Sequence, residues 1–247
     1  MLICPNNAIS RDGEIVDGVA GMTVHKALCD NCFLCVDACC CRAMRNRGRK
    51  YSASDLIDSV KLDMLFFQNS GGGVTVTGGE PLLQPEFTYA FLYGCKELGM
   101  HTMIETCGHG KYDDLSKIAE VCSGLYFDVK MLDAEKHSKW TGVSNTLILE
   151  NLGRLCKSID AAKKIIVRVP CIPNVNDNPE DIQEIALFVK SLGISSIQLM
   201  PYNTMAEEKY RWVGEEYFCA GLEARDKGFY ANLNRIIETT GMHAIYG

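Results

Sequence analysis

Seven of the 13 cysteines lie within the first 41 residues, and four of them have the spacing of cluster ligands. The run is Cys29-x2-Cys32-x2-Cys35-x3-Cys39. Four thiolates at these separations can enclose a cube of iron and sulfide, so the run predicts iron–sulfur ligation. Zinc is the alternative metal. Structural zinc usually takes four cysteines as two separated pairs, whereas these pairs overlap.

Cys4 completes the ligand set. In two-cluster ferredoxins the fourth cysteine of each run ligates the other run's cluster, and a proline follows it. Cys4-Pro5 has this form, as the tail of an earlier run whose first three cysteines are absent. On this interpretation the printed chain begins inside a motif, and Cys39 is a metal ligand left without its cluster. We therefore expect one [4Fe-4S] cluster held by Cys4, Cys29, Cys32 and Cys35.

The other six cysteines occur singly in apolar segments. Because free cysteine is among the most buried residue types, we expect these six to pack in the core. An odd cysteine total and a start unlike a signal peptide argue against a secreted disulfide framework and favour a reducing cytoplasm. The six are Cys95, Cys107, Cys122, Cys156, Cys171 and Cys219.

The composition is that of a globular protein of 247 residues, 47% hydrophobic and 23% charged, with a formal charge of -6. No apolar run approaches the length of a membrane span, and acidic proteins do not bind nucleic acid non-specifically, so we expect neither partner. Five basic residues between 42 and 50 form a solvated loop or a docking patch. We expect an incomplete iron–sulfur segment over 1–50 and a larger α/β domain over 51–247.

The larger part alternates between short apolar runs and segments of helical period. Repeated strand–helix–strand units predict a parallel sheet with right-handed crossovers, in an open doubly wound form or in a full or partial barrel. The expected strands are Val74–Thr77, Met103–Glu105, Leu125–Asp128, Ile165–Val169, Ile197–Met200 and Ala244–Tyr246.

Polar or glycine-rich features lie at or just beyond the ends of five of these runs. In parallel sheets the carboxyl ends of the strands share one face, so the five features should converge on one mouth. They are Gly78-Gly79-Glu80, Glu105-Thr106, Asp128-Val129-Lys130, Arg168, and Tyr202-Asn203.

The first of these features belongs to a glycine-rich segment over 71–81 that lacks the endings of phosphate-binding loops. Its glycines permit close approach of a ligand to the backbone. Glu80 can meet an amino group, and Lys130 can meet a carboxylate. Together these groups suit the zwitterionic end of an amino acid.

Six segments resemble the glycyl-radical-enzyme activating enzymes of the radical S-adenosylmethionine (SAM) superfamily that carry a ferredoxin-like insert. They are GGGVTVTGGEPLLQPEF, HTMIETCG, YFDVKMLD, KHSKWTGVSN, LILENL and IPNVNDN. The resemblance implies a partial (β/α)6 barrel, a [4Fe-4S] cluster and SAM. It also implies a 5′-deoxyadenosyl radical that takes a hydrogen from a backbone glycine of a partner glycyl-radical enzyme, with a flavodoxin or ferredoxin as electron donor.

The resemblance also assigns residues. It implies that Lys130 and Arg168 are catalytic and contact SAM, and that Asn203 stands where relatives place a histidine. Asparagine can donate a hydrogen bond but cannot titrate near neutral pH. The remaining SAM contacts that it implies are Gly78, Gly79, Glu80, Glu105, Thr106 and Asp128.

One departure from the family pattern concerns the SAM cluster loop, C-x3-C-x2-C. Cys35 and Cys39 have its first interval, but Arg42 occupies the third position. We therefore expect a partial radical SAM barrel that lacks its first strand, leaves a neighbouring strand edge unpaired, and is inactive alone. The alternative function is a non-enzymatic iron–sulfur protein that carries electrons or binds a partner.

For an activating enzyme, the partner glycyl-radical enzyme would be a decarboxylase or a lyase of the diol, choline or arylsuccinate type.

Overall fold

The computed structural model of the chain describes residues 3–16, 19–46, 48–158, 161–213 and 216–246. It divides into two units, Met1–Tyr51 and Ser52–Gly247. Each unit has its own secondary structure.

The first unit contains an antiparallel pair of strands, β1 (Ile9–Val16) and β2 (Val19–Val24), and one helical turn, α1 (Leu34–Asp37). A side chain on Gly13 would come within 2.9 Å of the backbone of Gly21, so this pair of glycines allows the strands to approach. The sequence analysis did not anticipate the hairpin.

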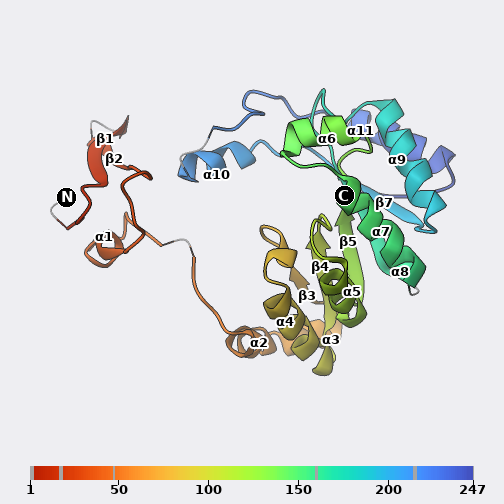
Figure 1. Cartoon of the computed structure of the whole chain (residues 1–247), viewed down its shortest axis with the longest axis horizontal. Coiled ribbons are helices and arrows are strands. Elements are labelled where there is room, and N and C mark those ends of the chain that lie inside the picture. Colours follow the sequence, from red (N-terminus) through yellow and green to blue (C-terminus); the bar gives the residue numbers. More distant parts are fainter. Residues whose placement is uncertain (1–2, 17–18, 47, 159–160, 214–215, 247) are drawn as a thin grey trace. The chain divides into compact units, whose positions relative to one another are not determined.

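The second unit is built on a six-stranded parallel sheet with the order β3-β4-β5-β6-β7-β8 (Figure 1). All six expected strands are present, which confirms those predictions. Each strand lies beside its predecessor, without the reversal of order that defines a doubly wound sheet, so the sheet is a partial barrel. The strands are β3 (Gly73–Val76), β4 (His101–Thr106), β5 (Gly124–Asp128), β6 (Ile165–Pro170), β7 (Ser196–Met200) and β8 (His243–Ile245).

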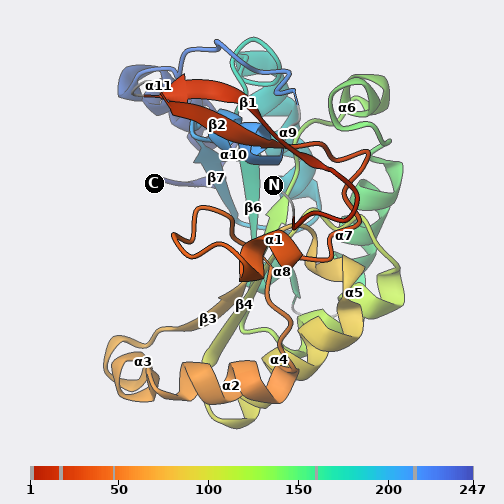
Figure 2. The ribbon, with the colours of Figure 1, turned by 90° about the vertical axis from the view of Figure 1, so that its left-hand side faces the viewer.

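Helices connect these strands, and α4, α5 and α7 lie along one side of the sheet (Figure 2). The helical period over 57–67, which the sequence presents as continuous, is divided between two helices that separate at Leu62 and Asp63. The helices are α2 (Ala53–Lys61), α3 (Met64–Ser70), α4 (Pro85–Glu97), α5 (Tyr112–Val121), α6 (Ala134–Thr141), α7 (Thr146–Ser158), α8 (Ala161–Lys164), α9 (Pro179–Ser191), α10 (Ala206–Val213) and α11 (Lys227–Thr239), with a 3-10 turn, η1 (Pro81–Leu83).

Helix capping follows the sequence signals. Ser52 and Asp55 form a capping box at the start of α2. Asn178 caps α9 and accepts a hydrogen bond from the backbone N–H of Asp181 at 2.8 Å, with Pro179 in the first turn. The cap of α9 fixes where the crossover from β6 to β7 enters its helix, and so where the loop after β6 ends.

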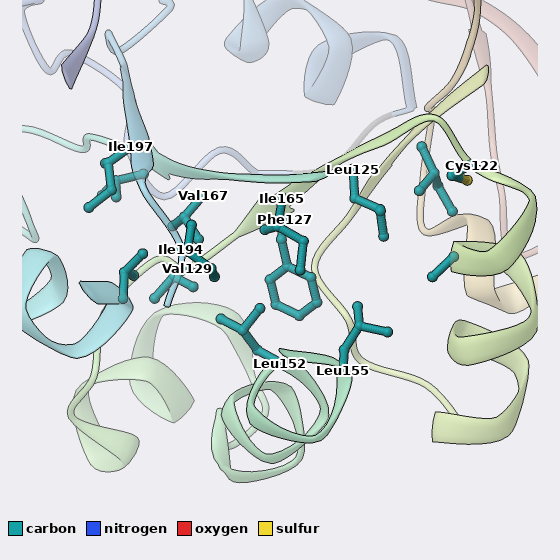
Figure 3. Packing of buried hydrophobic residues seen from close by; sticks show 14 of the residues in the cluster. Cys122, Leu125, Phe127, Val129, Leu152, Leu155, Ile165, Val167, Ile194 and Ile197 are labelled. Atoms are coloured by element: carbon teal, nitrogen blue, oxygen red, sulfur yellow. The ribbon is translucent and has the colours of Figure 1, made fainter. Parts of the chain in front are cut away.

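The core lies between the sheet and the helices. The Phe127 ring of β5 is fully buried and points toward Leu152 and Leu155 of α7 (Figure 3). Of the six scattered cysteines, Cys95 and Cys122 belong to this core together with Cys171, whereas the other three are only half-buried. Apolar burial of this kind fixes the strand register and with it the positions of the strand ends.

One edge of the sheet is open. Within the described residues β3 pairs only with β4, as expected for an unpaired edge. A groove of about 470 Å³ runs beside β3, lined by apolar side chains that include Leu56, Phe67 and Phe91. No helix in the described part of the chain is long and apolar enough to cross a membrane.

Candidate active site

A cavity of about 270 Å³ lies at the carboxyl ends of β3, β4, β5 and β6. Its lining includes four of the five polar features that follow the strands. The fifth does not contribute: Asn203 is exposed, is absent from the lining, and accepts a hydrogen bond from the backbone of Met205 at 2.9 Å. The lining residues are Thr77, Gly78, Gly79, Glu80, Glu105, Thr106, Cys107, Asp128, Lys130 and Arg168.

Glu80 connects the loop after β3 to the loop after β4. Its carboxylate accepts hydrogen bonds from the Thr106 hydroxyl at 2.6 Å, from the backbone N–H of Cys107 at 2.8 Å and from that of Leu82 at 3.1 Å. These donors hold the carboxylate in place, and within the described part of the chain no basic side chain forms an ion pair with it. Its negative charge therefore stays available to a cationic ligand.

The two glycines before Glu80 leave the backbone accessible. Gly78 has a φ of 131°, which only glycine adopts readily. Gly79 has no such requirement, and a Cβ built on it would meet nothing within 4 Å. The folded chain alone would tolerate a side chain at Gly79, so the open space above it is room for a ligand.

Arg168 joins the ends of three strands. Its guanidinium bonds both oxygens of Glu105 at 3.0 and 3.1 Å, bonds Asp128 at 3.2 Å, and lies 4.9 Å from the Tyr126 ring centroid. Burial opposes the charge, but both carboxylates outweigh it and raise the pKa of Arg168. The side chain is 13% exposed, so the pairs are partly shielded from water.

Glu105 and Lys130 differ in how firmly they are held. Burial favours protonation of Glu105, but hydrogen bonds from Arg168 and Thr77 outweigh it and hold its pKa below the usual value. Lys130 has only a long contact, 3.7 Å from its Nζ to Asp128, and is 31% exposed. A small rearrangement would let this ammonium group meet an anionic ligand.

Cys107 and Thr77 are lining residues that the sequence analysis did not assign to the site. Burial, with the neighbouring Glu80 carboxylate, raises the pKa of the Cys107 thiol to about 11, so it is a neutral thiol at pH 7. Each of the two directly adjoins a recognised feature, Cys107 after Glu105-Thr106 and Thr77 before Gly78. Their position next to residues already assigned to the site is the sequence signal that could have identified them.

The cysteines of the first unit have the donor chemistry for an iron–sulfur cluster. The thiol of Cys4 accepts a hydrogen bond from the backbone N–H of Ala8 at 3.2 Å. Cys39 lies 3.6 Å from Cys41, sulfur to sulfur. Among the described residues no three histidine, cysteine or acidic groups already stand together as a metal site. The ligand set Cys4, Cys29, Cys32 and Cys35 therefore stays a prediction.

Comparisons with known proteins were made for the whole chain. The family model of the Radical SAM superfamily matches residues 37–189. An isethionate sulfite-lyase activating enzyme from Oleidesulfovibrio alaskensis is 36% identical over 215 residues, covering 87% of this chain and 67% of the relative. A 4-hydroxyphenylacetate decarboxylase activating enzyme from Clostridioides difficile is 35% identical over 222 residues, covering 89% and 70%.

A solved structure agrees with these matches. A domain of pyruvate-formate lyase-activating enzyme from Bacteroides vulgatus superimposes with a TM-score of 0.59 and 28% identity, covering 71% of this chain and 99% of that one. The Streptococcus suis protein SuiB bound to S-adenosylmethionine has a TM-score of 0.56 at 17% identity, which supports the fold alone.

Proposed function

Because the chain belongs to the glycyl-radical-enzyme activating enzymes of the radical SAM superfamily, whose members use a [4Fe-4S] cluster and SAM, we propose that the cavity at the ends of β3 to β6 binds the methionine moiety of SAM. The charge of the lining supports this most directly. Glu80, Glu105 and Asp128 contribute three negative charges, and Lys130 and Arg168 contribute two positive ones. SAM carries two positive groups and one negative group, so the charges are complementary.

Each lining residue then has a distinct task. Glu80, held by N–H and O–H donors but without a basic partner, would receive the amino group. Lys130 would leave its long contact with Asp128 for the SAM carboxylate. Arg168 would keep Glu105 and Asp128 in place. When bound, the cluster and SAM supply one-electron chemistry that ends in abstraction of a hydrogen atom.

The proposed protein substrate is a glycyl-radical enzyme. The relatives are named as activating enzymes of a sulfite-lyase and of a decarboxylase, rather than only of pyruvate formate-lyase. We place this chain's partner in the same broad class. The electron would come from a flavodoxin or ferredoxin.

Calorimetric titration of the full chain with SAM tests the cavity assignment. Lys130→Met removes a charged hydrogen-bond donor, so we expect SAM binding to weaken by about tenfold or more. Lys157→Met, on the exposed face of α7, is the matched control and should bind like the wild type. Equal affinities for all three proteins would contradict the assignment, as would a wild-type chain that gives no heat with millimolar SAM. The second result would favour the alternative of a non-enzymatic iron–sulfur protein that carries electrons or binds a partner.

A further inference from the structure

Three asparagines lie buried behind the cavity, and each donates both of its amide hydrogens to backbone carbonyls. Asn145, Asn151 and Asn176 are 2%, 0% and 1% exposed. Their acceptors lie in the loops that follow β4 and β5 and at Pro170, the last residue of β6. We propose that these three are positioning residues that set the shape of the SAM-binding mouth.

Asn176 lies in the loop after β6 and connects two strand ends. Its Nδ2 donates to the carbonyl of Lys130 at 2.7 Å and to that of Pro170 at 2.8 Å. Its Oδ1 accepts from the backbone N–H of Ile172 at 2.7 Å. Lys130 lines the cavity, and Pro170 is two residues after Arg168, so one amide fixes the spacing between the strands that carry both cations.

Asn145 holds the chain directly beyond Lys130. It lies in the turn before α7, and its Nδ2 donates to the carbonyls of Met131 at 2.9 Å and Leu132 at 2.8 Å. The segment 130–132 is thus held at three successive carbonyls by two asparagines, although it lies beyond the end of β5 and its ladder.

Asn151 does the same for the loop after β4. From α7 its Nδ2 donates to the carbonyls of Gly108 at 2.8 Å and Gly110 at 2.9 Å. That loop begins at Cys107, whose backbone N–H bonds Glu80. The Oδ1 of Asn151 is buried with no partner among the described residues.

The unpartnered Oδ1 of Asn151 indicates that this residue does more than fill space in the core. A leucine would fill a similar volume without burying an unpaired acceptor, which is costly. The asparagine is therefore explained by its two donated bonds. Backbone carbonyls beyond a strand end need donors, and a planar NH2 group supplies two at a fixed angle.

The functional consequence rests on the function proposed above. If the mouth binds SAM, losing an asparagine amide should loosen the loop that carries Lys130 and weaken SAM binding more than it lowers stability. Whether the asparagines hold the loops in place does not depend on SAM. Amide hydrogen exchange in the loops and titration with SAM can therefore fail separately.

Amide hydrogen exchange on the full-length chain provides the direct test. Asn176→Asp keeps the side-chain volume but removes both donors. We expect exchange over 129–133 and 170–176 to rise by about tenfold or more, while the buried face of α9 exchanges as in the wild type. Asn234→Asp is the control, because Asn234 is buried in the same unit but, among the described residues, its side chain makes no hydrogen bond to these loops; unlike that of Asn176, its Oδ1 has no partner there. It should leave both loops protected.

Two results would overturn the proposal. One is unchanged exchange in both loops of the Asn176 variant. The other is an equal rise in exchange in both variants across loops and core, which would show a purely structural role. If either Asp variant fails to fold, Asn176→Ala and Asn234→Ala repeat the comparison. SAM titration of the same proteins should show a selective loss for the Asn176 variant. A wild-type chain that binds no SAM would refute the proposed function, while exchange would still decide the positioning role.

Discussion

Glu105 illustrates how one residue of the mouth is held charged. It receives the Arg168 guanidinium on both oxygens and the Thr77 hydroxyl on one of them, at 2.8 Å. Its pKa is consequently lowered although burial acts in the opposite direction. A carboxylate held in this way stabilises the fold only while it is ionised.

Replacing Thr77 by valine should therefore have a pH-dependent effect. Because the folded-state pKa of Glu105 is depressed, the stabilisation from its partners is fully present above its unfolded value and is lost as the pH falls through the folded value. We expect Thr77→Val to cost about 0.5 kcal/mol at pH 7, since Thr77 is exposed and the Glu105 side chain is 26% exposed, and to cost less at about pH 4, below the ordinary glutamate pKa. Urea unfolding at both pH values measures this.

Thr75→Val is the control, because Thr75 is exposed on β3, two residues before Thr77, and among the described residues its side chain makes no hydrogen bond to Glu105. The same loss for Thr77→Val at both pH values would show that the hydroxyl does not act through the charge of Glu105.

Individual site residues could be predicted where a charged side chain lay at the end of an expected strand. Glu80, Lys130 and Arg168 were identified because each is charged and lies at or just beyond the end of an apolar run. The buried asparagines were not assigned a role, because an asparagine far along the chain from its acceptors carries no local pattern. Asn151 is 43 residues from Gly108.

At the scale of elements, the strands of the second unit were predictable because buried parallel strands appear as short apolar runs. The β1–β2 hairpin was missed because its polar residues and bulged register hide the alternation. Helix α6 was missed because only one of its residues, His137, is buried, so it has no apolar period. The loops depend on tertiary contacts and could not be derived from local sequence.

The loop after β4 provides an element-scale prediction. Gly108 has a φ of 71°, and a Cβ built there would lie 2.2 Å from the buried Phe127 ring. Gly108→Ala should lower the free energy of unfolding by about 2 to 4 kcal/mol, because it adds backbone strain to overpacking. The urea unfolding midpoint measures the change.

Gly142→Ala is its control. Gly142 at the end of α6 has a φ of 81°, but its Cβ would meet nothing within 4 Å. It should cost about 1 kcal/mol from backbone strain alone. Equal losses at both positions would mean that the Phe127 ring moves aside freely, and that the loop is not packed as described.

At the scale of the whole molecule, the cysteines proposed as cluster ligands belong to the first unit, and the cavity belongs to the second. We expect anaerobic reconstitution to give about four iron atoms per chain, by the ferredoxin rule. Cys32→Ser should lower the iron content, because it removes a proposed ligand, whereas Cys39→Ser should leave it unchanged. Iron analysis and the visible absorption spectrum measure this. A preparation that takes up only zinc, or equal losses in both variants, would contradict the ligand set.

The reactivity of the reconstituted chain follows from the same ligand set. A cluster with a cysteine on each of its four irons has no coordination position left for SAM, and the printed chain has no C-x3-C-x2-C to hold a second one, because Arg42 stands at the third position. A guanidinium stays protonated and does not ligate iron. We therefore expect the reconstituted, reduced chain to bind SAM without releasing 5′-deoxyadenosine above a control without protein, as measured by chromatography. Release that persists in Cys32→Ser would place the reacting cluster on other cysteines. Release that disappears in Cys32→Ser would mean that one iron of the Cys4, Cys29, Cys32 and Cys35 cluster is open to SAM.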